Sequence, residues 1–465
     1  MGIEKDGQDR RRVFYRSLSF FFVLFFVLVL LLVSAISTTL YAADDSAKKE
    51  STATSELNGV EPTPTPEKGV DVPKEPVVTH HSITVGGKEL KYTATAGFIP
   101  ILDDKTGEEQ ASLFYTAYSL EGTADPSTRP VTFAFNGGPG SASLWVHLGA
   151  FGPKKAMRSE DGTKLVPPPY MLSDNENSIL DLTDMVFIDP VGTGFSRVVG
   201  KGETKKFWGV QEDLGSTAEF IRLYLTRNNR WVSPIYVAGE SYGTTRAAGL
   251  AKTLQDLGIF PNGIILISPI LSYEFDPDNT GNDSLYVLTL PTYAASAWYH
   301  KKITPRLQKN LDEALKEVRE WSQNQYLYAL WEGNTFPEEE RKAILDRLVE
   351  YSGLSREFLD RHNLRVGIED FANEILKDQK NSVSLYDSRV IGTGEYDFNN
   401  DPILAVISSG PFISAFHDYL RRQLKFETDR KYISLSEEAN ASWNWQSGEP
   451  GGMGYPNTAN FLLDA

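Results

Sequence analysis

The sequence predicts an α/β fold with a mostly parallel central sheet and an inserted block of helices. Several short apolar runs, each long enough for one buried strand, end in glycine-rich loops. Stretches with helical spacing of apolar residues separate these runs, which is typical of parallel strands joined by crossover helices. Between residues 277 and 390 only helical patterns are found, and sheet-like sequence resumes afterwards.

The first 43 residues are predicted to be an export signal. A basic segment is followed by fourteen consecutive apolar residues, Phe20 to Val33, and then by small residues that offer cleavage sites after Ala35 or Ala43. The alternative is an uncleaved anchor, because residues 18–36 approach the length that spans a membrane. We therefore expect an exported protein, periplasmic or secreted, with membrane contact only through those residues.

Residues 44–80 are predicted to be a disordered linker. They are rich in Pro, Thr, Glu and Lys and lack apolar periodicity. Folding is expected to begin near Ile83, with a hairpin formed by the strand-like segments 90–96 and 111–118.

Residues 81–276 are predicted to form the first part of the sheet core. Val131 to Phe135, Met185 to Ile188 and Ile264 to Ile267 have the composition of buried strands, and Lys206 to Leu225 has helical spacing. Ligand sites in such sheets lie at the carboxyl ends of the strands, where the glycine-rich loops of this sequence also begin.

One of these strand ends carries a serine in a recognisable setting. Gly239-Glu240-Ser241-Tyr242-Gly243 separates the apolar run 235–238 from a helix-like stretch, 244–257. A serine on a sharp strand-to-helix turn is the nucleophile elbow of α/β-hydrolases, which predicts that fold and a covalent hydrolase. The turn would present the Ser241 hydroxyl and direct the Tyr242 N–H to the same point. The Gly137-Gly138 pair can supply a second N–H for an oxyanion, because glycine tolerates the required backbone angles.

The helical block at 277–390 is predicted to be a cap inserted into the hydrolase core, with a separate helical domain as the alternative. Thr304-Pro305 and Phe336-Pro337 begin helices, and Gly353 ends the second of them. Residues 391–465 are expected to return to the core. They contain a sheet-like apolar run, Leu404 to Ile407, and a helix around 412–424.

The composition excludes several classes of function. A net charge of −16 argues against a nucleic-acid partner, which would need basic patches. The chain has no cysteine, and none of its six histidines lies in an H-E-x-x-H pattern, so no metal and no cofactor are expected. The oligomeric state is not indicated.

Three blocks of the sequence resemble the serine carboxypeptidases, in order and in spacing. They are NGGPGSAS from Asn136, DPVGTGFS from Asp189 and GESYG from Gly239. The similarity extends from about Ile83 to the end and is greatest to the cysteine-free bacterial branch. The resemblance implies an exopeptidase that releases C-terminal residues from peptides through an acyl-enzyme.

Each matching position then takes a role from the family. Ser241 would be the nucleophile, and Gly138 and Tyr242 would supply the oxyanion N–H groups. Asn136 and Glu240 would bind the carboxylate of the peptide substrate. Since two carboxylates in a dry pocket repel, Glu240 must carry a proton, and activity should favour acidic pH.

The sequence also departs from the family. Well-known members have a Trp where this chain has Ala134 and a second Glu where it has Ala150. No histidine after Ser241 is preceded by glycine as the family pattern requires, and His147 is expected to be structural. We therefore expect a truncated form that lacks the triad's Asp and His. An esterase or acyltransferase on the same fold, or a non-catalytic relic that only binds ligand, are the alternatives.

Overall fold

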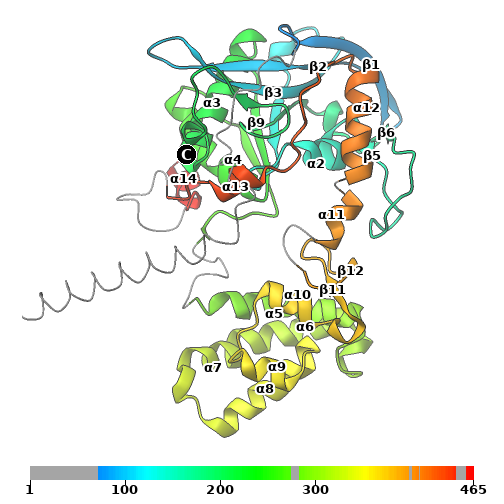
Figure 1. Ribbon diagram of the computed structural model, residues 1–465, viewed down its shortest axis with the longest axis vertical. Coiled ribbons are helices and arrows are strands. Elements are labelled where there is room, and N and C mark those ends of the chain that lie inside the picture. Colours follow the sequence, from blue (N-terminus) through cyan, green and yellow to red (C-terminus); the bar gives the residue numbers. More distant parts are fainter. Residues whose placement is uncertain (1–71, 274–281, 397–400, 408, 447–456, 465) are drawn as a thin grey trace, which may run out of the picture. The chain divides into compact units, whose positions relative to one another are not determined.

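The computed structural model describes residues 72–273, 282–396, 401–407, 409–446 and 457–464 (Figure 1). The predicted signal, most of the predicted linker and the span considered as an anchor lie outside these residues. In the part of the chain that is described, every helix is too short or too polar to cross a bilayer.

A mixed sheet of eight strands forms the centre of the described structure. The strand order is β1-β2-β3-β7-β4-β9-β10, and β8 pairs with β3. The strands are β1 (Val77–Val85), β2 (Lys88–Leu102), β3 (Glu109–Leu120), β4 (Val131–Phe135), β7 (Asp184–Ile188), β8 (Arg197–Val198), β9 (Ile235–Glu240) and β10 (Gly263–Ile267).

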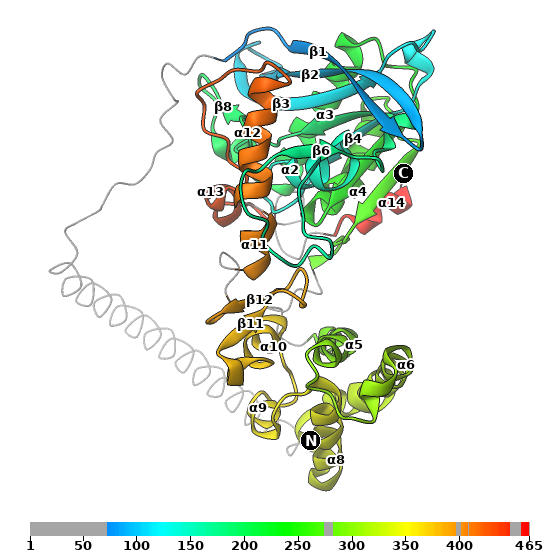
Figure 2. The same ribbon diagram turned by 90° about the vertical axis from the view of Figure 1, so that its right-hand side faces the viewer.

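The N-terminal part of the sheet is antiparallel. Strands β1, β2 and β3 follow one another as neighbours, which Figure 2 shows as long adjacent arrows. The predicted hairpin is therefore present, with longer strands than expected. The linker prediction was wrong at its end, because β1 begins at Val77 and residues 77–80 pair with β2. In β1 the side chains alternate between more exposed and more buried positions, as they do in a strand with one buried face.

The other part of the sheet is parallel and carries the predicted site. Strand β4 pairs in parallel with β7 and β9, and β9 with β10. Helices α3 (Val210–Arg227) and α4 (Tyr242–Asp256) contribute buried residues to one core with Phe133 and Val237. The next residues along each strand, Ala134 and Ala238, belong to a second core, as the period of two in a strand requires. The predicted α/β-hydrolase architecture is thus confirmed, with helices packed on a sheet whose strands are parallel around the serine.

The predicted helical block has a hydrophobic core of its own. Its helices are α5 (Ser284–Tyr299), α6 (Leu311–Trp321), α7 (Leu327–Glu332), α8 (Glu338–Ser352), α9 (Arg356–Arg361) and α10 (Ile368–Glu374). Helix α8 ends at Gly353, whose φ of 71° is left-handed, so the predicted stop is observed. The expectation of no strands here was wrong, because β11 (Asn381–Val383) pairs with β12 (Ile391–Thr393).

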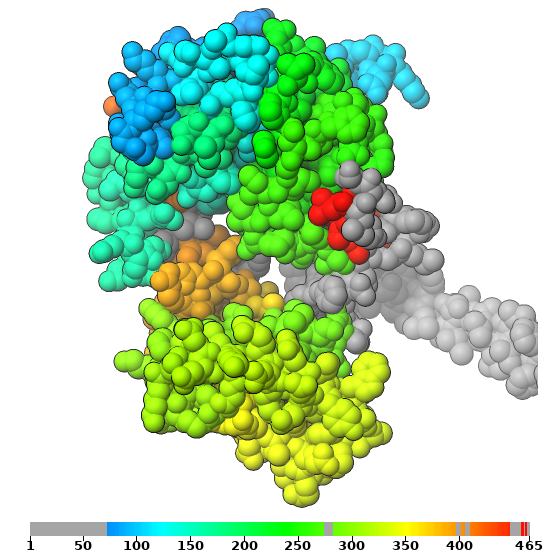
Figure 3. Space-filling model, turned by 180° about the vertical axis from the view of Figure 1, so that it is seen from behind, coloured from blue at the N-terminus to red at the C-terminus, as the bar shows by residue number. Residues whose placement is uncertain are grey.

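Residues 401–464 are mostly helical where they are described. The helices are α11 (Pro402–Ile407), α12 (Ala415–Arg422), α13 (Glu437–Ala441) and α14 (Ala459–Asp464). The sheet-like prediction for Leu404 to Ile407 was wrong, because these four residues belong to α11. A run of four apolar residues has no period long enough to separate a strand from a helix. Helix α14 packs against α4, and Figure 3 shows it as red atoms beside green.

Three short elements complete the description. Helix α2 (Leu144–Val146) follows the first glycine-rich loop, and β5 (Lys154–Ala156) pairs with β6 (Leu172–Asp174) in a separate hairpin. Isolated bridges from Ser141 to Leu435 and from Gly194 to Ile433 connect residues 433–435 to both glycine-rich loops. The loops at the carboxyl ends of β4 and β7 are therefore held by the same late segment of the chain.

Candidate active site

Ser241 occupies the turn between β9 and α4 in a strained conformation. Its φ of 57° and ψ of −127° are angles that a residue with a side chain seldom adopts. The turn is fixed by two kinds of backbone contact: the Ser241 N–H donates to the Ile267 carbonyl at 3.0 Å, and the Ser241 carbonyl accepts from the Thr244 N–H at 2.8 Å. The side chain is half-buried and has no hydrogen-bond partner among the described residues. These angles and contacts agree with the sharp strand-to-helix turn that the sequence predicts at Ser241.

The glycines around Ser241 are required by close backbone approach. A Cβ on Gly239 would lie 1.9 Å from the Gly243 carbonyl oxygen. A Cβ on Gly137 would lie 2.4 Å from the Tyr242 nitrogen and 2.7 Å from the Gly243 nitrogen. The loop after β4 is therefore pressed against the start of α4. This contact brings Gly137, the residue before the predicted oxyanion donor Gly138, next to the backbone nitrogen of Tyr242, the second predicted donor.

Asn136 and Glu240 form a hydrogen-bonded pair beside the serine. Asn136 follows β4 and is buried, and its Nδ2 donates to Glu240 Oε2 at 2.9 Å. Its Oδ1 accepts the N–H groups of Trp145 and Val146 at 3.1 and 3.0 Å, which fixes the orientation of the carboxamide. Asn136 therefore joins the end of β4, the end of β9 and helix α2.

The environment of Glu240 favours its protonated form. Burial raises the pKa of this carboxyl, while the Asn136 carboxamide and the Gly137 N–H act in the opposite direction. Among the described residues, the phenol of Tyr386 is a titratable group near this carboxyl, and the pKa of Tyr386 is raised by its own burial and then by Glu240. A carboxyl that holds a proton above its usual pH range can donate a hydrogen bond to an anion.

The two alanines that depart from the resemblance place no polar group in this site. Ala134 is buried in the second core, on the opposite face of β4 from Phe133. Ala150 is exposed. Of the four positions that the resemblance connects with carboxylate binding, only Asn136 and Glu240 carry a polar side chain in this chain.

None of the six histidines, all of which lie in described residues, hydrogen-bonds to Ser241. His147 is buried, its Nε2 lies 2.6 Å from the Tyr118 hydroxyl, and burial lowers its pKa to about 3. His147 is thus a core residue, as predicted. His417 lies on α12 against the rings of Phe195 and Tyr432. The other four make hydrogen bonds away from Ser241: His80 with Glu121, His81 with Thr79, His300 with the Ser388 carbonyl and His362 with the Phe358 carbonyl.

Two buried acids near the site were not predicted from the sequence. Asp189, at the end of β7, accepts the Ser143 N–H at 2.8 Å, and burial raises its pKa to about 7. Asp213 on α3 pairs with Arg246 on α4. The sequence signal for Asp189 was an acidic residue directly after an apolar run, whereas Asp213 stands among other polar residues and gave no such signal. The described residues contain no cluster of three or more acidic or histidine side chains suited to a metal ion.

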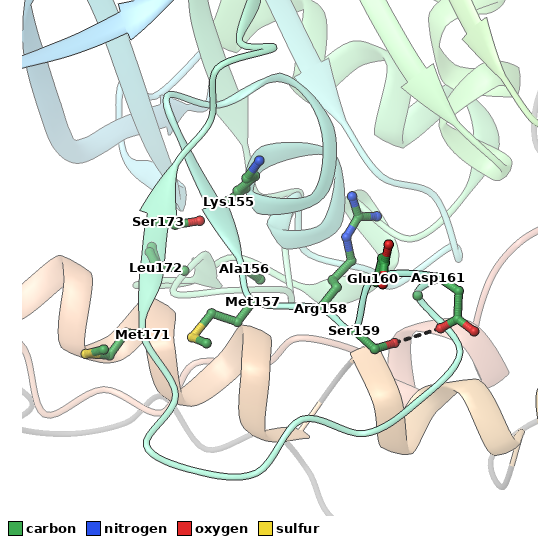
Figure 4. Close-up of a pocket in the computed structure, with 11 residues that line it drawn as sticks. Lys155, Ala156, Met157, Arg158, Ser159, Glu160, Asp161, Met171, Leu172 and Ser173 are labelled. Atoms are coloured by element: carbon green, nitrogen blue, oxygen red, sulfur yellow. Dashed lines mark hydrogen bonds between the residues drawn. The ribbon is translucent and has the colours of Figure 1, made fainter.

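A surface cavity of about 760 Å³ lies at the β5–β6 hairpin (Figure 4). Residues 155–162 and 171–173 line it, and the Ser159 hydroxyl donates to Asp161 at 3.0 Å. Neither Ser241 nor the Asn136–Glu240 pair belongs to its lining. This cavity is therefore distinct from the candidate active site.

Comparison with known proteins gives a consistent result. A family model described as serine carboxypeptidase matches residues 86–338, which include all five predicted site residues. The chain is 26% identical over 223 residues to serine carboxypeptidase-like 45 of Arabidopsis thaliana, covering 43% of this chain and 44% of that protein. It is 34% identical over 135 residues to a serine carboxypeptidase of Dictyostelium discoideum, covering 28% of this chain and 29% of that protein.

The chain thus spans less than half the length of these curated relatives. Among solved structures, a prohormone-processing carboxypeptidase from Saccharomyces cerevisiae matches with a TM-score of 0.44 and 17% identity, over 80% of this chain and 70% of that one.

Proposed function

Because the chain belongs to the serine carboxypeptidase family, we propose that it is an exported hydrolase that releases C-terminal residues from peptides through an acyl-enzyme on Ser241. The observation that carries this proposal is the position of the Asn136–Glu240 pair directly beside a strained serine whose hydroxyl has no hydrogen-bond partner in the described part of the chain. Export is supported by the basic and apolar pattern of residues 1–43.

The pair explains how a C-terminal residue could be selected. The Asn136 carboxamide and a protonated Glu240 would both donate hydrogen bonds to the substrate's terminal carboxylate. That contact would fix the peptide so that its last peptide bond lies at Ser241. The N–H groups of Gly138 and Tyr242 would then receive the charge that develops on the carbonyl oxygen, an effect worth about 2.7–4 kcal/mol per donor in known cases.

Acyl transfer also requires a base for the Ser241 proton. Since all six histidines have their contacts elsewhere, we infer that the triad's His and its Asp are not supplied by the described residues. The chain alone should then retain only the small rate that the oxyanion donors and substrate binding provide.

A second candidate is an esterase or acyltransferase with the same nucleophile. The observation that favours it is the lack of a polar or aromatic side chain at Ala134 and Ala150, which leaves fewer groups to bind a carboxylate. A protein that binds ligand without turnover is the third possibility and gains if no base is found.

Binding of a dipeptide distinguishes these candidates and needs no catalytic base. We would measure, between pH 4 and 8, the affinity of an N-blocked phenylalanyl-leucine dipeptide and of its C-terminal amide. A carboxypeptidase site should prefer the free acid, and binding should weaken as pH rises through the Glu240 pKa. Equal affinity for the acid and the amide would contradict the carboxypeptidase proposal and favour an ester substrate.

A further inference from the structure

Arg246 lies on α4, one helical turn after the nucleophile, and its side chain is fully buried. Its Nε donates to Asp213 Oδ2 of α3 at 2.7 Å. Burial raises the pKa of Asp213, and the Arg246 guanidinium counteracts that rise. Removing two charges from water is costly, and a buried pair of this kind is not required for stability alone, since apolar residues can often replace it.

The guanidinium also contacts both loops of the candidate site. Its Nη1 donates to the backbone carbonyl of Asn136 at 2.8 Å. Its carbon lies 4.9 Å from the centre of the Phe135 ring and 5.3 Å from the centre of the Tyr242 ring. The Arg246 guanidinium therefore contacts Phe135 at the end of β4, the backbone of Asn136 and the ring of Tyr242.

The peptide group between Asn136 and Gly137 connects this cation to Glu240. Its carbonyl oxygen accepts the Arg246 hydrogen bond, and its N–H lies beside the Glu240 carboxyl and lowers the pKa of that group. A hydrogen bond to the carbonyl polarises a peptide group and strengthens its N–H as a donor. Arg246 thus acts on Glu240 through one peptide plane, without contacting it.

We propose that Arg246, held by Asp213, is a positioning residue that fixes the loop after β4, which begins at Asn136, against α4 and tunes Glu240 through the Asn136–Gly137 peptide group. The proposal rests on the proposed function for the role of Glu240, but the loop contact stands independently of it. The groups that face Glu240 are the Asn136 carboxamide, the Gly137 N–H and the Tyr386 phenol. A change at position 246 replaces none of these residues and acts only on the donor strength of the Gly137 N–H.

The main variant is Arg246→Met combined with Asp213→Asn, which removes both charges and leaves no unpaired ion in the core. Arg246→Lys is the second variant, since it keeps the charge but loses the fork that contacts Asp213 and Asn136 together. The control is Arg230→Met with Asp184→Asn. That pair is also buried, with 2.7 Å between Nη1 and Oδ2, but Asp184 begins β7 and lies at the amino ends of the parallel strands. Asp184 also accepts the Arg129 Nε at 2.7 Å through Oδ1, and the amide oxygen of asparagine can still accept that hydrogen bond.

The first measurement is hydrogen exchange of the full chain, read in peptides that cover residues 136–146 and 240–250. We expect the Arg246 variants to speed exchange in both segments by about tenfold, corresponding to about 1.4 kcal/mol, and the control to leave both unchanged. The second is the pH midpoint for binding of the N-blocked phenylalanyl-leucine dipeptide. It should rise by roughly half a unit in the Arg246 variants and stay constant in the control.

Each outcome decides the inference. Faster exchange with a raised midpoint supports it. Unchanged exchange in the two segments, or the same change in the Arg230 control, overturns it, as does a midpoint that does not move. If wild-type protein does not bind the dipeptide at any pH, the proposed function fails, and hydrogen exchange alone then decides whether Arg246 positions the loop. Should the double variant not fold, Arg246→Lys gives the same two readouts.

Discussion

Replacing Ser241 with glycine should stabilise the protein while removing its proposed nucleophile. The φ of 57° and ψ of −127° at this position cost a residue with a side chain of order 1–3 kcal/mol. Glycine avoids that cost but loses about 0.5–1 kcal/mol more through chain entropy than alanine does. Ser241→Gly is therefore expected to be about 1 kcal/mol more stable than Ser241→Ala, which keeps the strain and also lacks the hydroxyl.

The comparison of glycine with alanine is made by thermal or urea unfolding, with Ser216 as the control position. Ser216 lies inside α3, where glycine should be about 1 kcal/mol less stable than alanine. The order of the two variants should thus reverse between positions 241 and 216. If glycine is the less stable variant at both, the turn at Ser241 stores no strain and our description of the nucleophile elbow is refuted.

Three further predictions follow from contacts in and around the site. Glu240→Gln should abolish the loss of dipeptide-acid binding as pH rises, because Gln is a neutral donor at every pH; a profile that still falls would show that another group titrates. The pKa of Asp189 is about 7 in the folded protein and 3.8 ordinarily, so the folded state keeps this proton to higher pH and the protein should lose stability as pH rises from about 4 to about 7. Asp189→Asn should remove this loss, which amounts to up to about 4 kcal/mol. Parallel pH–stability curves for the two proteins would contradict the prediction. Gly137→Ala should lower the free energy of unfolding by about 2–4 kcal/mol, because its Cβ would lie 2.4 Å from the Tyr242 nitrogen. Gly215→Ala in α3 has open space for a Cβ and should be neutral or stabilising. Equal unfolding midpoints for the two variants would count against the close loop contact.

The sequence was sufficient for the parallel part of the fold and for the arrangement at Ser241. Buried strands such as Val131 to Phe135 are short, mostly apolar runs that lead into glycine-rich loops, and the carboxyl ends of parallel strands must meet at one edge of the sheet. That rule, with the five residues around Ser241, is enough to bring the loop of Gly138 to the Tyr242 N–H.

Other features depend on contacts that no local pattern contains. The run from Leu404 to Ile407 is too short to show a period, and packing decides that it is helical. The Arg246–Asp213 pair joins residues of two different helices, so each looks like an ordinary charged position until the helices are packed. The hairpin of β11 and β12 has three residues in each strand, below the length at which alternation can be recognised.

The most direct test of the account is covalent labelling of the full chain with a fluorophosphonate, with and without added imidazole as an external base, followed by mass spectrometry of the digested protein. We expect the adduct on the peptide that contains Ser241, a faster reaction when imidazole is present, and no adduct at that position in Ser241→Ala. Labelling that is spread over other hydroxyl groups, or that is the same in wild type and Ser241→Ala, would contradict the assignment of Ser241 as the nucleophile.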